Sequence, residues 1–147
     1  MSKIIKIGIT QTKGSSIINV NSAEVIKGKG IVNDRKFIEN NQKERQITLV
    51  EIENINYFNN ISKTNIAPLN FRRNVITENI RLNQLVGKEF FAGNVKLKAH
   101  DLCRPCKYLQ NKLKLNNFVK EFSLKGGLRC EILTSGKINV GDIIKVI

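Results

Sequence analysis

Short runs in which apolar and polar residues alternate recur along the chain, and this pattern restricts its fold more than any other feature. In residues 95–100, Val, Leu and Ala alternate with Lys, Lys and His, and residues 3–9 place Ile5, Ile7 and Ile9 on one side. A period of two residues predicts a strand with one buried face. A Gly-Asn pair directly before the first of these runs is typical of a hairpin turn.

Further short strands and two helices complete the predicted fold. Residues 51–60 have Ile52, Ile55 and Phe58 at helical spacing, and residues 108–122 form the second expected helix. No strand–helix–strand rhythm indicates a parallel sheet. We therefore expect about eight or nine strands in a mainly β fold, a mostly antiparallel β-barrel with two short helical insertions. The chain is expected to form a single domain over residues 1–147. The remaining strands are expected at residues 46–50, 71–77, 89–91, 128–133, 137–140 and 143–147, and residues 17–20 and 24–26 are short β candidates.

The chain is strongly basic, with 25 lysines and arginines against 12 acidic residues and a formal charge of +13. This balance favours an anionic partner, such as nucleic acid, anionic lipid or a phosphorylated small molecule. The 18 lysines are spread out without a run or stripe, which argues against nucleic-acid binding. No apolar run approaches the ~18–20 residues of a membrane helix. With no secretion signal either, we expect a cytoplasmic protein without a membrane partner.

Three cysteines occur in the chain, and two of them lie close together in the motif Cys103-Arg-Pro-Cys106. An odd count without a secretion signal indicates reduced thiols. Cys130 has the setting of a small buried strand residue. On paper, Cys130 and His100 could complete a zinc site with the pair, but the spacing is not that of a zinc finger. A thioredoxin-like pair is disfavoured because no strand–helix–strand unit is expected here.

Cys106 is the better candidate for a nucleophile or a metal ligand. Pro105 precedes it and a predicted helix follows, so Cys106 is expected near a helix N-terminus. The helix dipole and the neighbouring Arg104 and Lys107 favour its thiolate. The alternative is an inert cysteine in a turn.

Two further motifs contain arginines suited to an anion. In Phe71-Arg-Arg-Asn74, neighbouring arginines on a strand are expected to point to opposite faces, and a guanidinium binds phosphate or carboxylate with two parallel bonds. Asp34-Arg35 follows a glycine loop and is either a local ion pair or a ligand clamp. Arg129 begins a predicted strand after two glycines, which by itself indicates only a hairpin.

Together, seven motifs resemble the MOSC domain family, named after the C-terminal domain of molybdenum-cofactor sulfurase. The resemblance covers roughly residues 3–147, and the family fold is a β-barrel. The motifs are GIVNDR (30–35), RQITLVE (45–51), FRRNVIT (71–77), LNQLVG (82–87), CRPCKYL (103–109), GLRCEIL (127–133) and VGDII (140–144).

The resemblance implies a molybdenum cofactor (molybdopterin) and a reactive cysteine at Cys106. That cysteine would ligate molybdenum or carry a persulfide, and Cys103 would resolve the persulfide as a disulfide. Arg72 and Asn74 would hold the phosphate and the pterin of the cofactor, and Arg35 and Arg129 complete the expected cofactor-binding set. Pyridoxal phosphate binding is associated with the family as a whole and is assigned to no residue here.

The resemblance leaves the activity open. The first interpretation is a cofactor-binding protein, such as a small reductase of N-hydroxylated compounds or a carrier of the cofactor. The second is a sulfur-transfer protein without bound cofactor, acting on a small sulfur acceptor, and the third is a basic nucleic-acid- or anion-binding barrel. The chain resembles a MOSC domain alone, so a reductase would need a separate electron-donor protein. A sulfur carrier would need a separate cysteine desulfurase.

Overall fold

Strands dominate the structure, a computed structural model that describes residues 1–103 and 125–147. Among these residues there is one α-helix, α1 (Ile52–Ser62), and three 3-10 helices, η1 (Lys43–Arg45), η2 (Pro68–Phe71) and η3 (Leu82–Leu85). The strands are β1 (Lys3–Ile9), β2 (Ile18–Val20), β3 (Ser22–Ile26), β4 (Gly30–Ile31), β5 (Ile47–Glu51), β6 (Val75–Glu78), β7 (Glu89–Ala92), β8 (Val95–Leu102), β9 (Leu128–Ile132), β10 (Gly136–Asn139) and β11 (Ile144–Val146).

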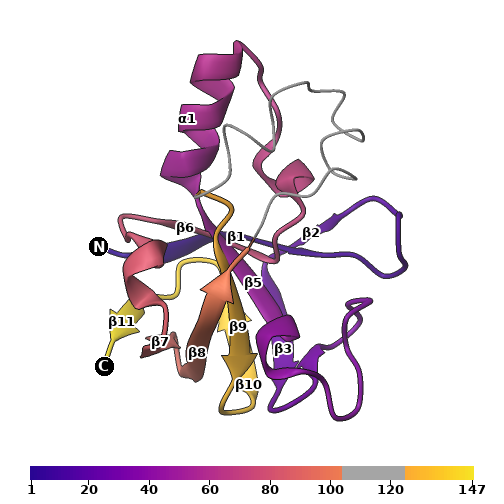
Figure 1. Cartoon of the computed structure of the whole chain (residues 1–147). Coiled ribbons are helices and arrows are strands. Elements are labelled where there is room, and N and C mark those ends of the chain that lie inside the picture. Colours follow the sequence, from indigo (N-terminus) through magenta and orange to yellow (C-terminus); the bar gives the residue numbers. More distant parts are fainter. Residues whose placement is uncertain (104–124) are drawn as a thin grey trace.

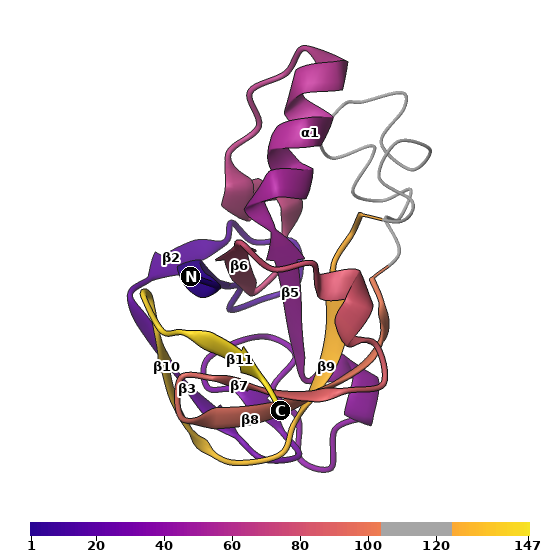
Figure 2. The same ribbon diagram turned by 90° about the vertical axis from the view of Figure 1, so that its left-hand side faces the viewer.

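Eight of the strands form one mixed sheet in the order β11-β7-β8-β9-β5-β6-β1-β2, and the others form a small sheet in the order β10-β3-β4. Figure 2 shows the large sheet curling, with α1 at one end of it, next to the end of β5. Backbone hydrogen bonds join Ile4 to Gly141 and Asp142, so the first strand meets the segment before β11. The predicted mainly β, barrel-like fold is confirmed.

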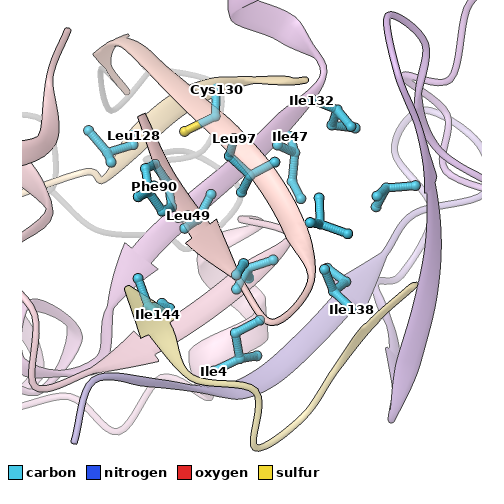
Figure 3. Packing of buried hydrophobic residues seen from close by; sticks show 14 of the residues in the cluster. Ile4, Ile47, Leu49, Phe90, Leu97, Leu128, Cys130, Ile132, Ile138 and Ile144 are labelled. Atoms are coloured by element: carbon cyan, nitrogen blue, oxygen red, sulfur yellow. The ribbon is translucent and has the colours of Figure 1, made fainter. Parts of the chain in front are cut away.

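Apolar side chains fill the inside of the curled sheet. Figure 3 shows residues from opposite sides of the curl, such as Ile4, Leu49 and Phe90, pointing toward a common centre. A second cluster lies under α1, where Ile55 and Phe58 pack on Phe71 and Ile76. The rings of Phe58 and Phe71 meet edge to face at 5.9 Å between centroids. The sheet is therefore covered on both faces around β5 and β6.

The alternation in β8 is confirmed, whereas the one in β1 is broken. Val95, Leu97 and Ala99 are buried, and the lysines between them are half-buried. In β1 the pairing register shifts between Ile4 and Lys6, which indicates a bulge. Ile4 and Ile7 consequently enter the main core, and Ile5 turns to the second cluster.

Two other expectations about the elements need correction. The strand expected over residues 71–77 begins only at Val75, because Pro68 starts the 3-10 turn η2 and Arg72 takes a left-handed conformation with φ +63°. The expectation of no strand–helix–strand unit is wrong as well, since β5 and β6 are parallel and α1 lies between them in the chain. The expected helix 51–60 is confirmed as α1, and the one over 108–122 lies outside the described residues (Figure 1).

No helix within residues 1–103 and 125–147 has the length and apolar character required to cross a membrane.

Candidate functional site

A cationic cavity of about 250 Å³ opens where several chain segments meet near β5 and β9. Its lining comes from the loop after β4, from η1, from β5, from the residue two positions before β6, from the end of β8 and from β9. The lining residues are Lys36, Glu44, Arg45, Thr48, Arg73, Cys103 and Arg129. This is the place where a thiol, three arginines and a lysine converge.

Two glycines allow the backbone to close around Cys103. The Cys103 backbone NH donates a 2.7 Å hydrogen bond to the Gly127 carbonyl. A Cβ on Gly126 would lie 2.5 Å from the Cys103 carbonyl oxygen, and one on Gly127 would overlap the carbonyl oxygen of Leu49. These contacts hold the end of β8 beside β9 and fix the thiol at the cavity wall.

The Cys103 thiol is buried among cations. Its residue is 5% exposed, and burial raises the pKa of the thiol. The positive charges of Arg73, Lys36 and Arg129 oppose this effect and lower the pKa, whereas Asp101 raises it. The cavity therefore keeps the thiol protonated when empty and surrounds it with charges that favour an anion on sulfur.

The cations of the cavity lack acidic partners among the described residues. The ion pairs of the described chain join Lys3 with Glu78, Lys29 with Glu39, Lys96 with Glu89 and His100 with Glu131, and none of them involves the cavity.

Lys36 shows the same crowding of positive charge. Burial lowers its pKa, and the neighbouring Arg35 and Arg73 lower it further, while Cys103 and Asp34 act in the opposite direction. Converging cations that outnumber the acidic groups beside them are typical of an anion-binding site.

A second, much smaller polar pocket adjoins the cavity, and Lys36 lines both. Arg35, Arg72 and Asn74 also line it, with about 20 Å³ of free space. Arg72 donates through Nη2 to the Ser15 carbonyl at 2.9 Å. Arg73 donates through Nε to the Gly126 carbonyl at 2.8 Å, on the side of the larger cavity. The two arginines diverge as expected, but through the left-handed backbone of Arg72 and not through strand alternation.

Asn74 is buried, and both polar atoms of its side chain are hydrogen-bonded within the fold. Its Oδ1 accepts hydrogen bonds from the backbone NH and the hydroxyl of Thr48, both at 3.1 Å, and its Nδ2 donates to the Gly8 carbonyl at 3.2 Å. The side chain thereby ties the residue before β6 to β5 and β1. Asp34 works in a similar way, because its carboxylate accepts from the backbone NH groups of Thr10 and Lys36.

The structure thus distributes the predicted residues over two neighbouring pockets. Cys103 and Arg129 line the cavity, and Arg35, Arg72 and Asn74 line the small pocket. Cys106, expected as the molybdenum ligand, lies outside the described residues.

Sequence reasoning did not select Lys36, Arg45 or Arg73 for the site. The paired arginines at 72 and 73 were the available signal for Arg73. Nothing in the sequence distinguished Lys36 from the other lysines.

The remaining cysteine and the histidine lie elsewhere. Cys130 is fully buried in the main core, as expected for a small strand residue. His100 contacts Glu131 with 2.7 Å between Nε2 and Oε1 and is half-buried. Within the described part of the chain, no group of three or more His, Cys, Asp or Glu side chains is arranged to hold a metal.

Comparisons with known proteins identify relatives of this fold. The sequence profile of the MOSC domain matches residues 33–145. The crystal structure of the YuaD protein from Bacillus subtilis is similar with a TM-score of 0.82 and 22% identity, over 99% of this chain and 96% of that one. YiiM from Geobacillus stearothermophilus is similar with a TM-score of 0.80 and 17% identity, over 100% of this chain and 75% of that one. YiiM from Escherichia coli gives 0.74 and 16%, over 99% and 69%. A comparison with curated protein sequences gives no match.

Proposed function

The chain belongs to the MOSC domain family, and we propose that it binds a molybdenum cofactor, molybdopterin, at the cationic cavity and the adjoining pocket. The observation that supports this most is the convergence of Lys36, Arg45, Arg73 and Arg129 on a cavity that Cys103 also lines. Guanidinium groups suit a phosphate, and a thiolate suits molybdenum, so the residues present fit a phosphate-bearing group with a sulfur-binding metal.

In this proposal, each residue has a separate task. Arg73 and Arg129 hold the phosphate in the larger cavity, and Arg35 and Arg72 extend the positive field from the small pocket. Asn74 positions the strands that present these arginines, because its own polar atoms are already bonded within the fold. Cys106 supplies the thiolate ligand. When bound, the cofactor would supply a redox-active metal, and the electrons for a reductase would come from a separate electron-donor protein.

The surroundings of Cys103 favour a second candidate, a sulfur carrier. The Cys103 thiol is 5% exposed among three cations and lies three positions before Cys106 in the sequence, so in this candidate it attacks a persulfide on Cys106. The attack forms a Cys103–Cys106 disulfide and releases hydrosulfide to a small sulfur acceptor. A separate cysteine desulfurase loads Cys106. We place either activity in the cytoplasm, where thiols remain reduced.

Elemental analysis for molybdenum, tungsten and zinc tests the first proposal, on protein purified without oxygen from a host that makes the cofactor. We expect stoichiometric molybdenum or tungsten, lost in Cys106→Ser. The Arg129→Ala variant should lose roughly 1.5–3 kcal/mol of cofactor binding, because its guanidinium holds the phosphate. Arg81→Ala is the matched control, because Arg81 is exposed and lies outside both pockets.

Three outcomes separate the candidates. Bound molybdenum that depends on Cys106 supports the cofactor proposal and justifies assays with N-hydroxylated compounds. Absence of both metals, with an added sulfur atom on Cys106 in the intact mass, supports the carrier. Stoichiometric zinc contradicts both, since the cysteine pair would then be a zinc site.

A further inference from the structure

We propose that the cavity around Cys103 binds an anionic sulfane-sulfur donor of the thiosulfate class and that Cys103 accepts the outer sulfur atom as a persulfide. The inference rests on the proposed sulfur-carrying function and names its donor. It gives the chain a route to loaded sulfur that needs no desulfurase.

The charge of the lining fits this donor together with an ionised thiol. Four cations and the carboxylate of Glu44 give the lining a formal charge of +3. A thiosulfate dianion and one thiolate bring three negative charges, so binding and ionisation together neutralise the cavity. The carboxylate of Asp101 opposes this ionisation, because its negative charge raises the pKa of the Cys103 thiol.

The thiol distinguishes this donor from a simple oxyanion. Sulfate or phosphate would satisfy the cations and leave Cys103 without a role, although it is a nucleophilic group on the cavity wall. An anion with an electrophilic sulfur uses both features. Because the cavity measures about 250 Å³ and a liquid water takes up about 30 Å³, an anion of a few heavy atoms enters with room to spare.

The step balances without an external oxidant or reductant. The Cys103 thiol gives its proton to solvent, and the thiolate attacks the outer sulfur of thiosulfate. A bond forms between Sγ and that sulfur as the sulfur–sulfur bond of thiosulfate breaks, and its electron pair leaves on sulfite. Arg73 and Arg129 stand beside the thiol, where they stabilise the charge on the departing sulfite.

The experiment uses the full chain with Cys106→Ser, so that transferred sulfur cannot reside on Cys106. The protein is incubated with thiosulfate labelled at the outer sulfur, and the intact mass, the labelled peptide and the released sulfite are measured. We expect one added sulfur on Cys103, an equal amount of sulfite, and loss of both in the Cys103→Ser, Cys106→Ser double variant.

Charge variants in the same background test the cavity itself. Arg45→Ala removes an exposed cation of the lining and should lower the labelling rate about tenfold or more. Arg73→Ala and Arg129→Gln should lower the rate by a similar factor. Arg129→Gln is included because Arg73 Nε donates to the Gly126 carbonyl, so Arg73→Ala can also disturb the fold. Arg81→Ala should leave the rate unchanged, and inorganic sulfate should compete with thiosulfate.

Each contrary result overturns the inference. The proposed donor site is contradicted if no label appears on Cys103 or if label is retained in the variant without Cys103. It is also contradicted if all arginine variants are labelled at the same rate. These outcomes are distinct from failure of the proposed function. Molybdenum binding or desulfurase loading of Cys106 in the wild-type chain does not depend on labelling of Cys103 by thiosulfate.

Discussion

At the residue scale, Asn74 lines the small pocket, and its side chain is also hydrogen-bonded within the fold. The hydrogen bonds of its side-chain amide join the residue before β6 to the start of β5 and the end of β1, and the residue is 7% exposed. We expect Asn74→Ala to lower the free energy of unfolding by about 2–4 kcal/mol, since it leaves the buried NH of Thr48 and carbonyl of Gly8 without this partner. Urea denaturation followed by circular dichroism measures this, with the exposed Asn19→Ala as control. Equal stability of the two variants would contradict the structural role.

Cys103 carries a prediction about pH. Burial raises the pKa of its thiol, so little thiolate is present at neutral pH and the reactive fraction grows as pH rises beyond the ordinary cysteine value. In Cys106→Ser, the rate of alkylation by iodoacetamide should therefore rise with pH along a curve shifted above that of a free cysteine. Lys36→Ala should shift the curve further upward, because it removes a cation that lowers this pKa. Mass spectrometry of the alkylated peptide gives the rate, and a curve below that of free cysteine would contradict the assignment.

Only part of the site could be predicted from individual residues. The Cys103–Cys106 motif and the arginine motifs drew attention to these residues, and Cys103 and Arg129 line the same cavity. The contributions of Lys36 and Arg45 depend on where loops far apart in sequence come together. No local pattern contains that information.

At the scale of elements, the approach of β9 to β5 depends on Gly127. Its φ is +97°, and a Cβ there would overlap the Leu49 carbonyl oxygen. We expect Gly127→Ala to cost more than ~3 kcal/mol, because the left-handed strain adds to a displacement of backbone. Gly28→Ala is a matched control, since its φ is +76° and nothing lies within 4 Å of the added Cβ. That variant should lose only about 1–2 kcal/mol. Thermal or urea unfolding of both variants measures the two losses of stability. Similar losses would show that the backbone near Leu49 moves aside at little cost in free energy.

The junction between β5 and α1 contains a carboxyl group with a raised pKa. Burial raises the pKa of Glu51 above 4.5, with Glu53 contributing, although hydrogen bonds from the Leu82 NH and Asn54 lower it. The native state then binds more protons than the unfolded state, so the free energy of unfolding falls as pH rises from 4.5 through the raised value.

Glu51→Gln keeps an acceptor oxygen and removes this proton uptake. The variant should gain stability relative to wild type across the same pH window, and the difference should vanish below it. Urea midpoints at a series of pH values, compared between the two proteins, measure this. A constant difference at every pH would mean that Glu51 does not titrate with a raised pKa.

Alternation predicted the elements better than it predicted their connections. A period-two pattern located β8, and helical spacing located α1, because burial on one face acts on each segment separately. The bulge in β1, the left-handed Arg72 and the parallel pairing of β5 with β6 arise from packing between segments. The missed parallel pair has a specific cause, since the long connection after α1 hid the strand–helix–strand unit.

At the scale of the whole molecule, the curled sheet needs its last strand. β11 pairs with β7, and the segment before it bonds to β1, so the C-terminal residues link the two sides of the large sheet. The two apolar clusters then lie inside the curl and beneath α1, which leaves the cationic pockets at the periphery of the core.

The net charge of +13 sets a final prediction about partners. Spread-out cations attract any polyanion through released counterions, and such binding weakens steeply as salt is added. We expect a duplex of ~20 base pairs to bind at low salt and to dissociate with a Kd weaker than ~10 µM near 0.15 M salt. Fluorescence anisotropy over a salt series measures this binding. Arg73→Ala and Cys106→Ser should give the same dependence of Kd on salt as the wild type, because a diffuse field does not depend on one cavity. Nanomolar binding at 0.15 M salt, or a slope that changes with Arg73, would instead make nucleic acid a specific partner and contradict the assignment of these cations to a small anion.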